Sequence, residues 1–197
     1  MRFTLVTTNK GKIEEFRRIF EQYNLWFRVE YLKTREIQSN DLREIARESV
    51  TYAYAILREP VIVEDAGLFI ESLKGFPGPY SSYVYKTIGV EGVLKLMDNV
   101  RDRSAAFHSV IAFYSPYTGV KIFTGEAKGK ISYEPRGKSG FGFDPIFIPE
   151  EGDGRTFAEM EIDEKNNISH RGKAARKFIE WITSLRSLPP PYVNMME

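Results

Sequence analysis

The polar segment Thr7–Lys12, with the sequence Thr-Thr-Asn-Lys-Gly-Lys, lies between an apolar run and a helical pattern. A helix N-terminus offers unsatisfied backbone N–H groups and a partial positive charge, which together suit a phosphate group. Lys12 adds a cation, and Gly11 permits close approach of the backbone to a ligand. The spacing of a P-loop is absent, so an ordinary strand-to-helix turn with surface lysines is the alternative interpretation.

The acidic pair Glu64–Asp65 directly follows the short apolar run Val61–Val63. In open α/β sheets ligands bind at the carboxyl ends of strands, and Mg²⁺ takes one or two carboxylates together with waters and substrate phosphates. A carboxylate at such a site can also accept a proton from water. Neighbouring strand residues point to opposite faces, so we expect only one of the two, Asp65, to reach a metal. A solvated acidic turn is the alternative.

The segment Ser139–Pro145 places Phe141 and Phe143 among glycines and ends on Asp144 and a proline. Aromatic rings presented on a loop can stack on a nucleobase, which is worth about 1–3 kcal/mol per base. The carboxylate of Asp144 can accept hydrogen bonds from base N–H groups. Two rings packed in the core are the alternative.

A second polar segment, Lys165–Arg171, immediately precedes the last helical pattern. Its two cations, Lys165 and Arg171, suit anionic groups or the carbonyl acceptors of a base. His170 can contact a base edge or a phosphate. A packed or capping histidine is the alternative for this position.

The composition narrows the classes of protein and site. The chain has 197 residues, no cysteine, two histidines and a formal net charge of +1. Thiolate chemistry and disulfides are excluded, a multi-histidine zinc site is disfavoured, and the charge balance argues against a nucleic-acid or polybasic membrane binder. The sequence shows neither a signal-peptide core nor a stretch of about 18 apolar residues, so we expect a cytoplasmic protein.

The hydrophobic pattern predicts the elements that must position these segments. We expect one domain over residues 1–187 and a proline-containing tail over residues 188–197. Strands are expected over residues 2–7, 26–32, 60–63, 104–115, 120–127, 128–133 and 146–148. Helices are expected after Lys10, from Asp41 to near Pro60, over 87–98 and over about 172–185. Residues 75–80 are expected to be loop. Helix–strand alternation followed by hairpins predicts a mixed sheet in an α/β domain.

Five motifs in one order closely resemble the inosine triphosphate pyrophosphatase family, whose members hydrolyse non-standard purine triphosphates such as dITP, ITP and XTP. The resemblance covers nearly the whole chain. The motifs are Thr7-Thr8-Asn9 with Lys12, Val63–Leu68, Gly75–Ser81, Gly140–Pro145, and Ala158–Met160 with Glu164–Asn166 leading to Ser169-His170-Arg171.

The resemblance implies an elongated α/β fold, with a long mixed β-sheet flanked by helices and two lobes around a central nucleotide cleft. It also implies a homodimer and a requirement for Mg²⁺. By position, Asp65 is implied as the catalytic proton acceptor and, with Glu36, as a metal ligand. The implied substrate-binding residues are Thr7, Thr8, Asn9, Lys10, Gly11, Lys12, Ala66, Phe141, Gly142, Phe143, Asp144, Lys165, His170 and Arg171.

The chain departs from the family pattern at two positions. Many relatives have glycine where this chain has Thr8, so a backbone geometry that needs glycine is in question there. Some relatives place a lysine twelve residues after the metal-binding glutamate, but that spacing from Glu36 gives Glu48. The role of that lysine is therefore not transferred.

The expected reaction converts a nucleoside triphosphate and water to the monophosphate and pyrophosphate. Attack at the α-phosphorus is the working assumption, and attack at the β-phosphorus remains open. We expect selectivity at position 6 of the purine, where hypoxanthine and xanthine carry an acceptor and adenine carries a donor. The alternatives are a pyrophosphatase for other modified nucleotides and a non-catalytic nucleotide sensor on the same fold.

Overall fold

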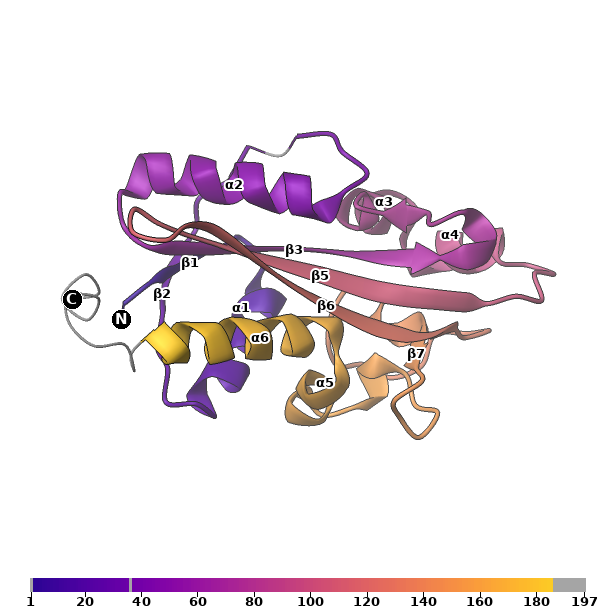
Figure 1. Cartoon of the computed structure of the whole chain (residues 1–197). Helices are drawn as coiled ribbons and strands as arrows, with labels where there is room; N and C mark the ends of the chain where they lie inside the picture. Colours follow the sequence, from indigo (N-terminus) through magenta and orange to yellow (C-terminus); the bar gives the residue numbers. More distant parts are fainter. Residues whose placement is uncertain (1, 36, 186–197) are drawn as a thin grey trace. The chain divides into compact units, whose positions relative to one another are not determined.

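The structure is a computed structural model of the chain, and it describes residues 2–35 and 37–185 (Figure 1). The described residues form a mixed seven-stranded sheet with helices, which confirms the expected α/β class. The strands are β1 (Thr4–Val6), β2 (Arg28–Glu30), β3 (Val61–Ile70), β4 (Pro77–Gly78), β5 (Ser104–Ser115), β6 (Gly119–Ile131) and β7 (Phe147–Pro149). The α-helices are α1 (Lys10–Glu21), α2 (Leu42–Leu57), α3 (Ser81–Thr87), α4 (Gly89–Leu96), α5 (Ile162–Ile168) and α6 (His170–Ser184).

The strand order in the sheet is β2-β1-β3-β5-β6-β7, and β4 pairs with β3 on a separate branch. Strand β1 runs parallel to β2 and β3, with Leu5 opposite Val29 and Ile62. Strand β4 runs antiparallel to β3, and strand β7 runs antiparallel to β6. Strand β1 is fully buried, as is usual for parallel strands covered on both faces.

The chain divides into two compact units. Among the described residues, unit 1 holds those up to Asp65, Val110–Thr124 and those from Ala174 on, and unit 2 holds Ala66–Ser109 and Gly125–Lys173. The strands β3, β5 and β6 contribute residues to both units. The domain bounds and the cleft between two lobes stay predictions, and the expected tail lies outside the described residues.

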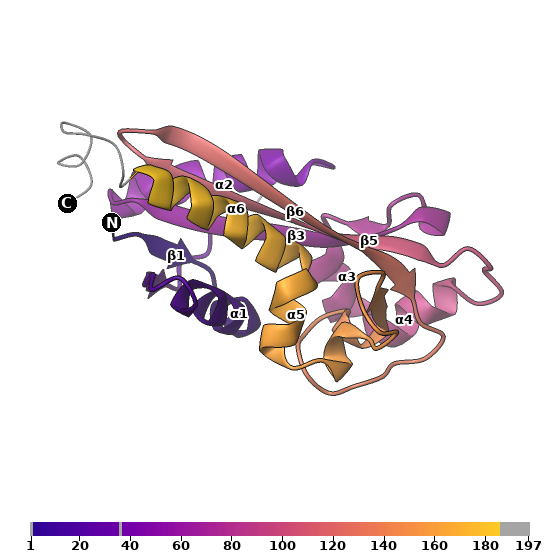
Figure 2. The ribbon, with the colours of Figure 1, turned by 60° about the horizontal axis from the view of Figure 1, so that its bottom comes forward.

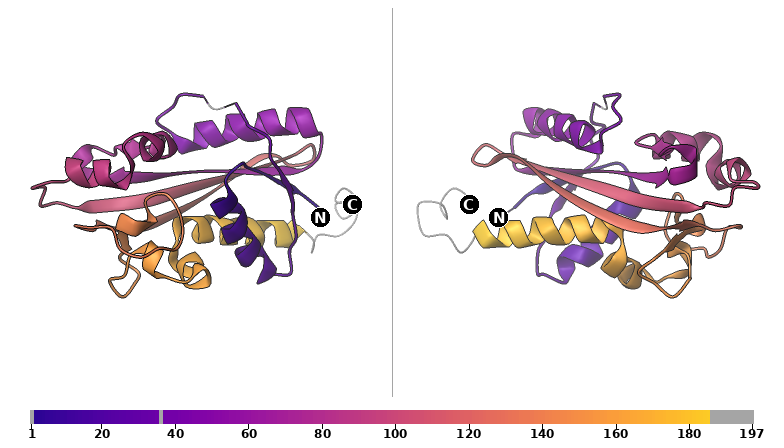
Figure 3. Two further views of the ribbon diagram at one scale, coloured as in Figure 1. Left: turned by 180° about the vertical axis from the view of Figure 1, so that it is seen from behind. Right: turned by 45° about the vertical axis from the view of Figure 1, so that its right-hand side comes forward.

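Unit 1 is a three-layer arrangement, in which α2 covers one face of its part of the sheet and α1 and α6 cover the other (Figures 1 and 3). The core on the side of α1 and α6 is rich in phenylalanine, with Phe3, Phe16, Phe20, Phe113 and Phe178 all buried. Helix α2 begins where expected, and Asp41 caps it, since its side chain accepts a hydrogen bond from the Arg43 N–H at 2.8 Å.

Unit 2 has its own core, which gathers apolar side chains from the strands and from the segments around α3–α5. This core contains Leu68, Ile70, Val84, Val93, Met97, Ala105, Phe107, Ala127, Ile131, Phe143, Ile146, Phe147, Phe157 and Met160. Helix α5 leads into α6 (Figure 2). At the junction, the Ser169 hydroxyl accepts a hydrogen bond from the Gly172 N–H at 3.0 Å. Each unit therefore holds its candidate segments on a separate buried core.

Strand β3 does not end at Val63 as expected, because the acidic pair and the residues after it continue the strand to Ile70. The charge of Glu64 is tolerated there because a lysine neutralises it, as described below. Gly67 lets β4 approach closely, since a Cβ at this position would lie 2.3 Å from the Gly78 carbonyl oxygen. The expectation that residues 75–80 are only loop was wrong, because Pro77 and Gly78 pair with β3.

The helix expected over residues 87–98 is present as α4, whereas two other helices, α3 and α5, were not expected. Helix α3 precedes α4, and Gly89, with a positive φ of 65°, separates the two. Helix α5 is short and polar, and its N-terminus is closed by a capping box between Glu161 and Glu164 rather than marked by an apolar stripe.

Candidate active site

The turn between β1 and α1 is built by side-chain hydrogen bonds to the backbone. Asn9 is the N-cap of α1, and its Oδ1 accepts a hydrogen bond from the Lys12 N–H at 3.1 Å. The Thr7 hydroxyl accepts one from the Asn9 N–H at 3.2 Å. Thr8 is exposed and does not take a positive φ, so this turn does not need glycine at that position. The expected strand–turn–helix arrangement of Thr7–Lys12 is therefore present.

Lys12 crosses from this turn to strand β3. Its Nζ lies 2.7 Å from Glu64 Oε2 and donates to the Glu64 carbonyl oxygen at 2.8 Å. The Glu64 carboxylate is buried, while 17% of the Lys12 side chain is exposed. A lysine ammonium has three donors, so these two contacts leave one for a ligand. Glu64 was set aside in the sequence analysis in favour of Asp65, and its role as the partner of Lys12 was missed.

Asp65 and Ala66 follow Glu64 in β3 and are half-buried. Because the strand continues, Asp65 points to the face opposite Glu64, as strand geometry predicts. The two carboxylates therefore have different surroundings. Glu36, the second expected metal ligand, lies outside the described residues. Among the described residues, no group of three or more His, Asp or Glu side chains is placed to hold a metal ion.

In unit 2 the structure brings Asp144 and Lys165 together as a buried ion pair. Lys165 Nζ lies 2.5 Å from Asp144 Oδ2, and the two side chains are 3% and 4% exposed. The same Oδ2 accepts a hydrogen bond from the Phe141 N–H at 2.8 Å. Gly140 has a φ of +72°, and a Cβ there would lie 2.1 Å from Asp144 Oδ2. This segment thus requires glycine both for its backbone and for the position of the carboxylate.

Phe141 lies under two cations. Lys165 Nζ is 5.2 Å from the centroid of its ring, and the guanidinium carbon of Arg171 is 5.3 Å from it. Lys165 Nζ is also 5.4 Å from the ring of Phe157, a residue that the sequence analysis missed. A cation over an aromatic face is attracted to the ring, and this attraction grows when water is excluded. The half-buried Phe141 ring therefore lies beside two cations, one of which is paired with Asp144.

The other two aromatic candidates are packed more deeply. Phe143 is 3% exposed in the core of unit 2 and meets the Tyr85 ring edge-on at 5.6 Å. His170 is buried and stacks on Phe107, with ring centroids 4.6 Å apart and planes inclined by 9°. Phe143 and His170 are thus both packed in the core, which was the alternative interpretation for each of them. Their contact with substrate stays a prediction.

The fold and these clusters define an α/β protein. One unit carries a capped helix N-terminus with a lysine, and the other carries an aromatic segment beside two cations. A family model described as the Ham1 family matches residues 3–181. The chain belongs to the Ham1 family. The resemblance identified in the sequence is thereby confirmed.

Relatives and solved structures agree with this assignment. A protein of Hyperthermus butylicus named dITP/XTP pyrophosphatase is 52% identical over 187 residues, which is 95% of this chain and 96% of that protein. A Thermococcus kodakarensis protein of the same name is 52% identical over 184 residues, 92% of this chain and 97% of that protein. The structure of a HAM1 protein from Coxiella burnetii superposes with a TM-score of 0.81 at 31% identity, covering 93% of this chain and 99% of that one.

Among the described residues, no helix combines the length and the apolar character that a membrane crossing requires.

Proposed function

We propose that this protein hydrolyses dITP and XTP, with ITP as a related substrate, to the nucleoside monophosphate and pyrophosphate, and so removes deaminated purines from the nucleotide pool. The observation that carries the proposal is the buried Asp144–Lys165 pair beside Phe141 and Arg171. Relatives named for this activity match the chain over more than nine-tenths of both lengths, which supports the same substrate class.

The segment Thr7–Lys12 is proposed to bind the triphosphate. The capped N-terminus of α1 offers backbone N–H groups, and Lys12 offers the donor that its contacts with Glu64 do not use. Negative charge accumulates on the departing pyrophosphate, so a cation and oriented N–H groups at this end stabilise the transition state more than the ground state. Asp65 is proposed to orient the attacking water and accept its proton.

The donor set is compatible with a divalent metal. Asp65 presents a half-buried carboxylate, and hard carboxylate oxygens are the ligands that Mg²⁺ prefers. The Glu64 carboxylate is taken up by Lys12, so Asp65 and Glu36 are the residues proposed to hold Mg²⁺ with the substrate phosphates. When bound, Mg²⁺ supplies charge neutralisation for phosphate oxygens.

The base is proposed to lie against Phe141, with Lys165 and Arg171 supplying hydrogen-bond donors to the 6-oxo group. Adenine carries an amino group at that position, so its N–H donor would face the N–H donors of Lys165 and Arg171. A site built around buried donors rejects such an analogue by several orders of magnitude when the donors are left unpaired. The proposal also includes a cytoplasmic location, which the sequence led us to expect, and a homodimer, which the family resemblance implies.

The test measures pyrophosphate release with Mg²⁺ from dITP, XTP, ITP, ATP, GTP and dTTP, with Asp65→Asn as the paired variant. We expect faster turnover of dITP, XTP and ITP than of ATP and GTP, and loss of most turnover in Asp65→Asn with nucleotide affinity largely kept. Preference for a different nucleotide would assign the protein to other modified nucleotides. Binding without turnover of any nucleotide would identify a sensor and overturn the proposal.

The site of attack can be read from the same reaction in ¹⁸O-labelled water. We expect the label in the monophosphate, which places the attack at the α-phosphorus. Label in the pyrophosphate would place it at the β-phosphorus and would require a different alignment of Asp65.

A further inference from the structure

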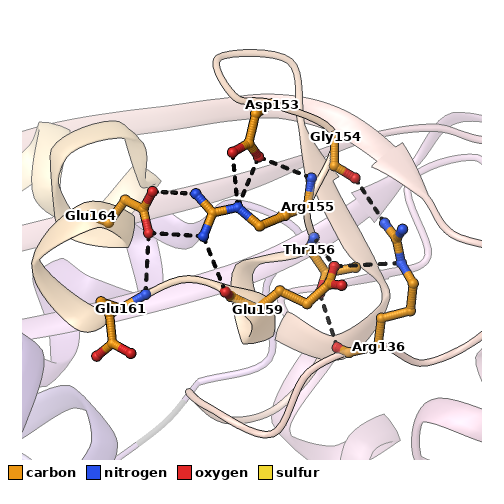
Figure 4. Close-up of polar contacts among 8 residues, drawn as sticks. All are labelled: Arg136, Asp153, Gly154, Arg155, Thr156, Glu159, Glu161 and Glu164. Carbon is orange, nitrogen blue, oxygen red and sulfur yellow. Dashed lines mark hydrogen bonds and ion pairs between the residues drawn. The ribbon is translucent and has the colours of Figure 1, made fainter.

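Arg155 stands outside the residues assigned above, and its guanidinium contacts two carboxylates and a backbone carbonyl. Its Nε donates to Asp153 Oδ1 at 3.0 Å and to Oδ2 at 2.9 Å. Its Nη1 donates to Glu164 Oε2 at 3.1 Å and to the Glu159 carbonyl oxygen at 3.3 Å, and its Nη2 donates to Glu164 Oε1. Figure 4 shows the guanidinium lying between the two carboxylates.

These contacts tie a loop to the start of α5. The fork on Glu164 is bidentate, the geometry in which arginine fixes a carboxylate most firmly. The Glu164 carboxylate also accepts a hydrogen bond from the Glu161 N–H at 3.3 Å, which completes the capping box of the helix. Hydrogen bonds from Arg155 lower the pKa of Glu164 below its ordinary value, so the carboxylate stays ionised at neutral pH.

The next residue after Glu164 is Lys165. Neighbouring residues of a helix are turned by about 100° from one another, so fixing the Glu164 side chain fixes the direction in which Lys165 leaves the helix. Helix α5 has seven residues, about two turns, and an isolated helix of that length is not stable in water. Contacts with its surroundings must therefore set its rotation, and Arg155–Glu164 and Lys165–Asp144 are two of them.

We propose that Arg155 is a positioning residue for substrate recognition, which sets the rotation of α5 through Glu164 and thereby places the Lys165 ammonium beside Asp144 and Phe141. This inference rests on the proposed role of Lys165 at the base. It predicts that loss of the fork displaces a donor that acts on the base and leaves the phosphate-binding segment in unit 1 unchanged.

The test compares KM, kcat and the preference for dITP over dATP in Arg155→Met and in Arg155→Lys. We expect Arg155→Met to raise the KM for dITP about tenfold, below the hundredfold that a displacement of about 1 Å can cost, with little change in kcat. We expect it to narrow the preference for dITP. Arg155→Lys should be intermediate, because an ammonium keeps the charge but cannot make the planar fork.

Arg136→Met is the matched control, because Arg136 holds the same loop without the fork on α5. Its Nη2 donates to the Gly154 carbonyl oxygen at 2.9 Å, and its Nε lies 3.5 Å from Glu159 Oε2 (Figure 4). We expect it to lower the melting temperature and to leave the KM and the preference for dITP unchanged. Glu164→Gln should reproduce the effect of Arg155→Met, and the double variant should add little to either single change.

Phe141→Ala separates failure of this inference from failure of the proposed function. If Phe141→Ala changes the base preference while Arg155→Met lowers only the melting temperature, Arg155 has a structural role and the inference is overturned. If neither variant changes the base preference, the assignment of the base to this segment is wrong. The inference would likewise be overturned if Arg155→Met and Arg136→Met changed the KM and the preference for dITP equally.

Discussion

Lys12 and Glu64, which are 52 residues apart in the sequence, form a contact in which one ammonium meets both the carboxylate and the backbone carbonyl of the same residue. The carboxylate is almost fully buried and the lysine is mostly so. Because β3 continues past this point, the pair joins the start of α1 to the interior of the sheet. A residue proposed to face phosphate thus also compensates a buried charge.

This pair predicts an asymmetric response to substitution. Lys12→Met removes a cationic partner of a buried carboxylate, so we expect the free energy of unfolding to fall by about 3–5 kcal/mol in urea denaturation. Glu64→Gln in the same background should restore part of the loss, because an amide is less costly to bury than an uncompensated carboxylate. Lys10→Met, on the exposed side of the same turn, is the control and should change stability little. A double variant no more stable than Lys12→Met would contradict this account.

Much of the fold could be predicted from the sequence, and the failures have a common physical origin. Strand β5 follows from its own apolar run, and Asp41 marks the start of α2. The extension of β3 through Glu64 depends on a lysine far along the chain, which no local pattern contains. Helix α5 depends on its caps and on Arg155, and its own residues are too few and too polar to predict it.

The candidate site shows the same division between local and long-range information. The motifs located Asp144 and Lys165, but their contact joins residues 21 positions apart and depends on Gly140 for room. The sequence left open whether Phe141 and Phe143 face a ligand or the core, because both occupy the same Gly-Phe-Gly-Phe pattern. Burial, which only the fold determines, separates the two rings.

We expect Phe141→Ala to affect mainly substrate recognition and Phe143→Ala to affect mainly stability. Phe141 is half-buried beside two cations, so its loss should raise the KM and reduce the base preference with a modest loss of stability. Phe143 is packed in the core, so its loss should lower the free energy of unfolding by about 3–5 kcal/mol. Steady-state kinetics on several nucleotides and urea denaturation measure the two effects. If Phe141→Ala changed stability alone, its ring would be a core residue as well.

Gly140 and Gly142 offer a matched pair of alanine substitutions. Both have positive φ, +72° and +64°, so each alanine should cost about 1–2 kcal/mol of backbone strain. At Gly142 the added Cβ meets nothing within 4 Å, whereas at Gly140 it would lie 2.1 Å from Asp144 Oδ2. We therefore expect Gly140→Ala to be clearly the more destabilising and to raise the KM, because Asp144 must move away from Lys165. Equal losses of stability would show that the carboxylate relaxes without cost.

His108 predicts how stability depends on pH. Its imidazole packs on the Phe69 ring at 4.6 Å, and burial lowers its pKa below the ordinary value of 6.5, against the opposing effect of the Glu126 and Glu71 carboxylates. The unfolded chain then binds a proton more readily than the folded one, so this contribution to stability is complete above pH 6.5 and is lost as the pH falls through the folded pKa. Urea denaturation of the wild type and His108→Gln between pH 8 and pH 5 isolates this contribution, since glutamine does not titrate. We expect the stability difference between wild type and variant to shrink or change sign in favour of the variant as the pH falls. If acidification instead stabilises the wild type relative to His108→Gln, the effect of Glu126 and Glu71 on the pKa of His108 outweighs the effect of burial.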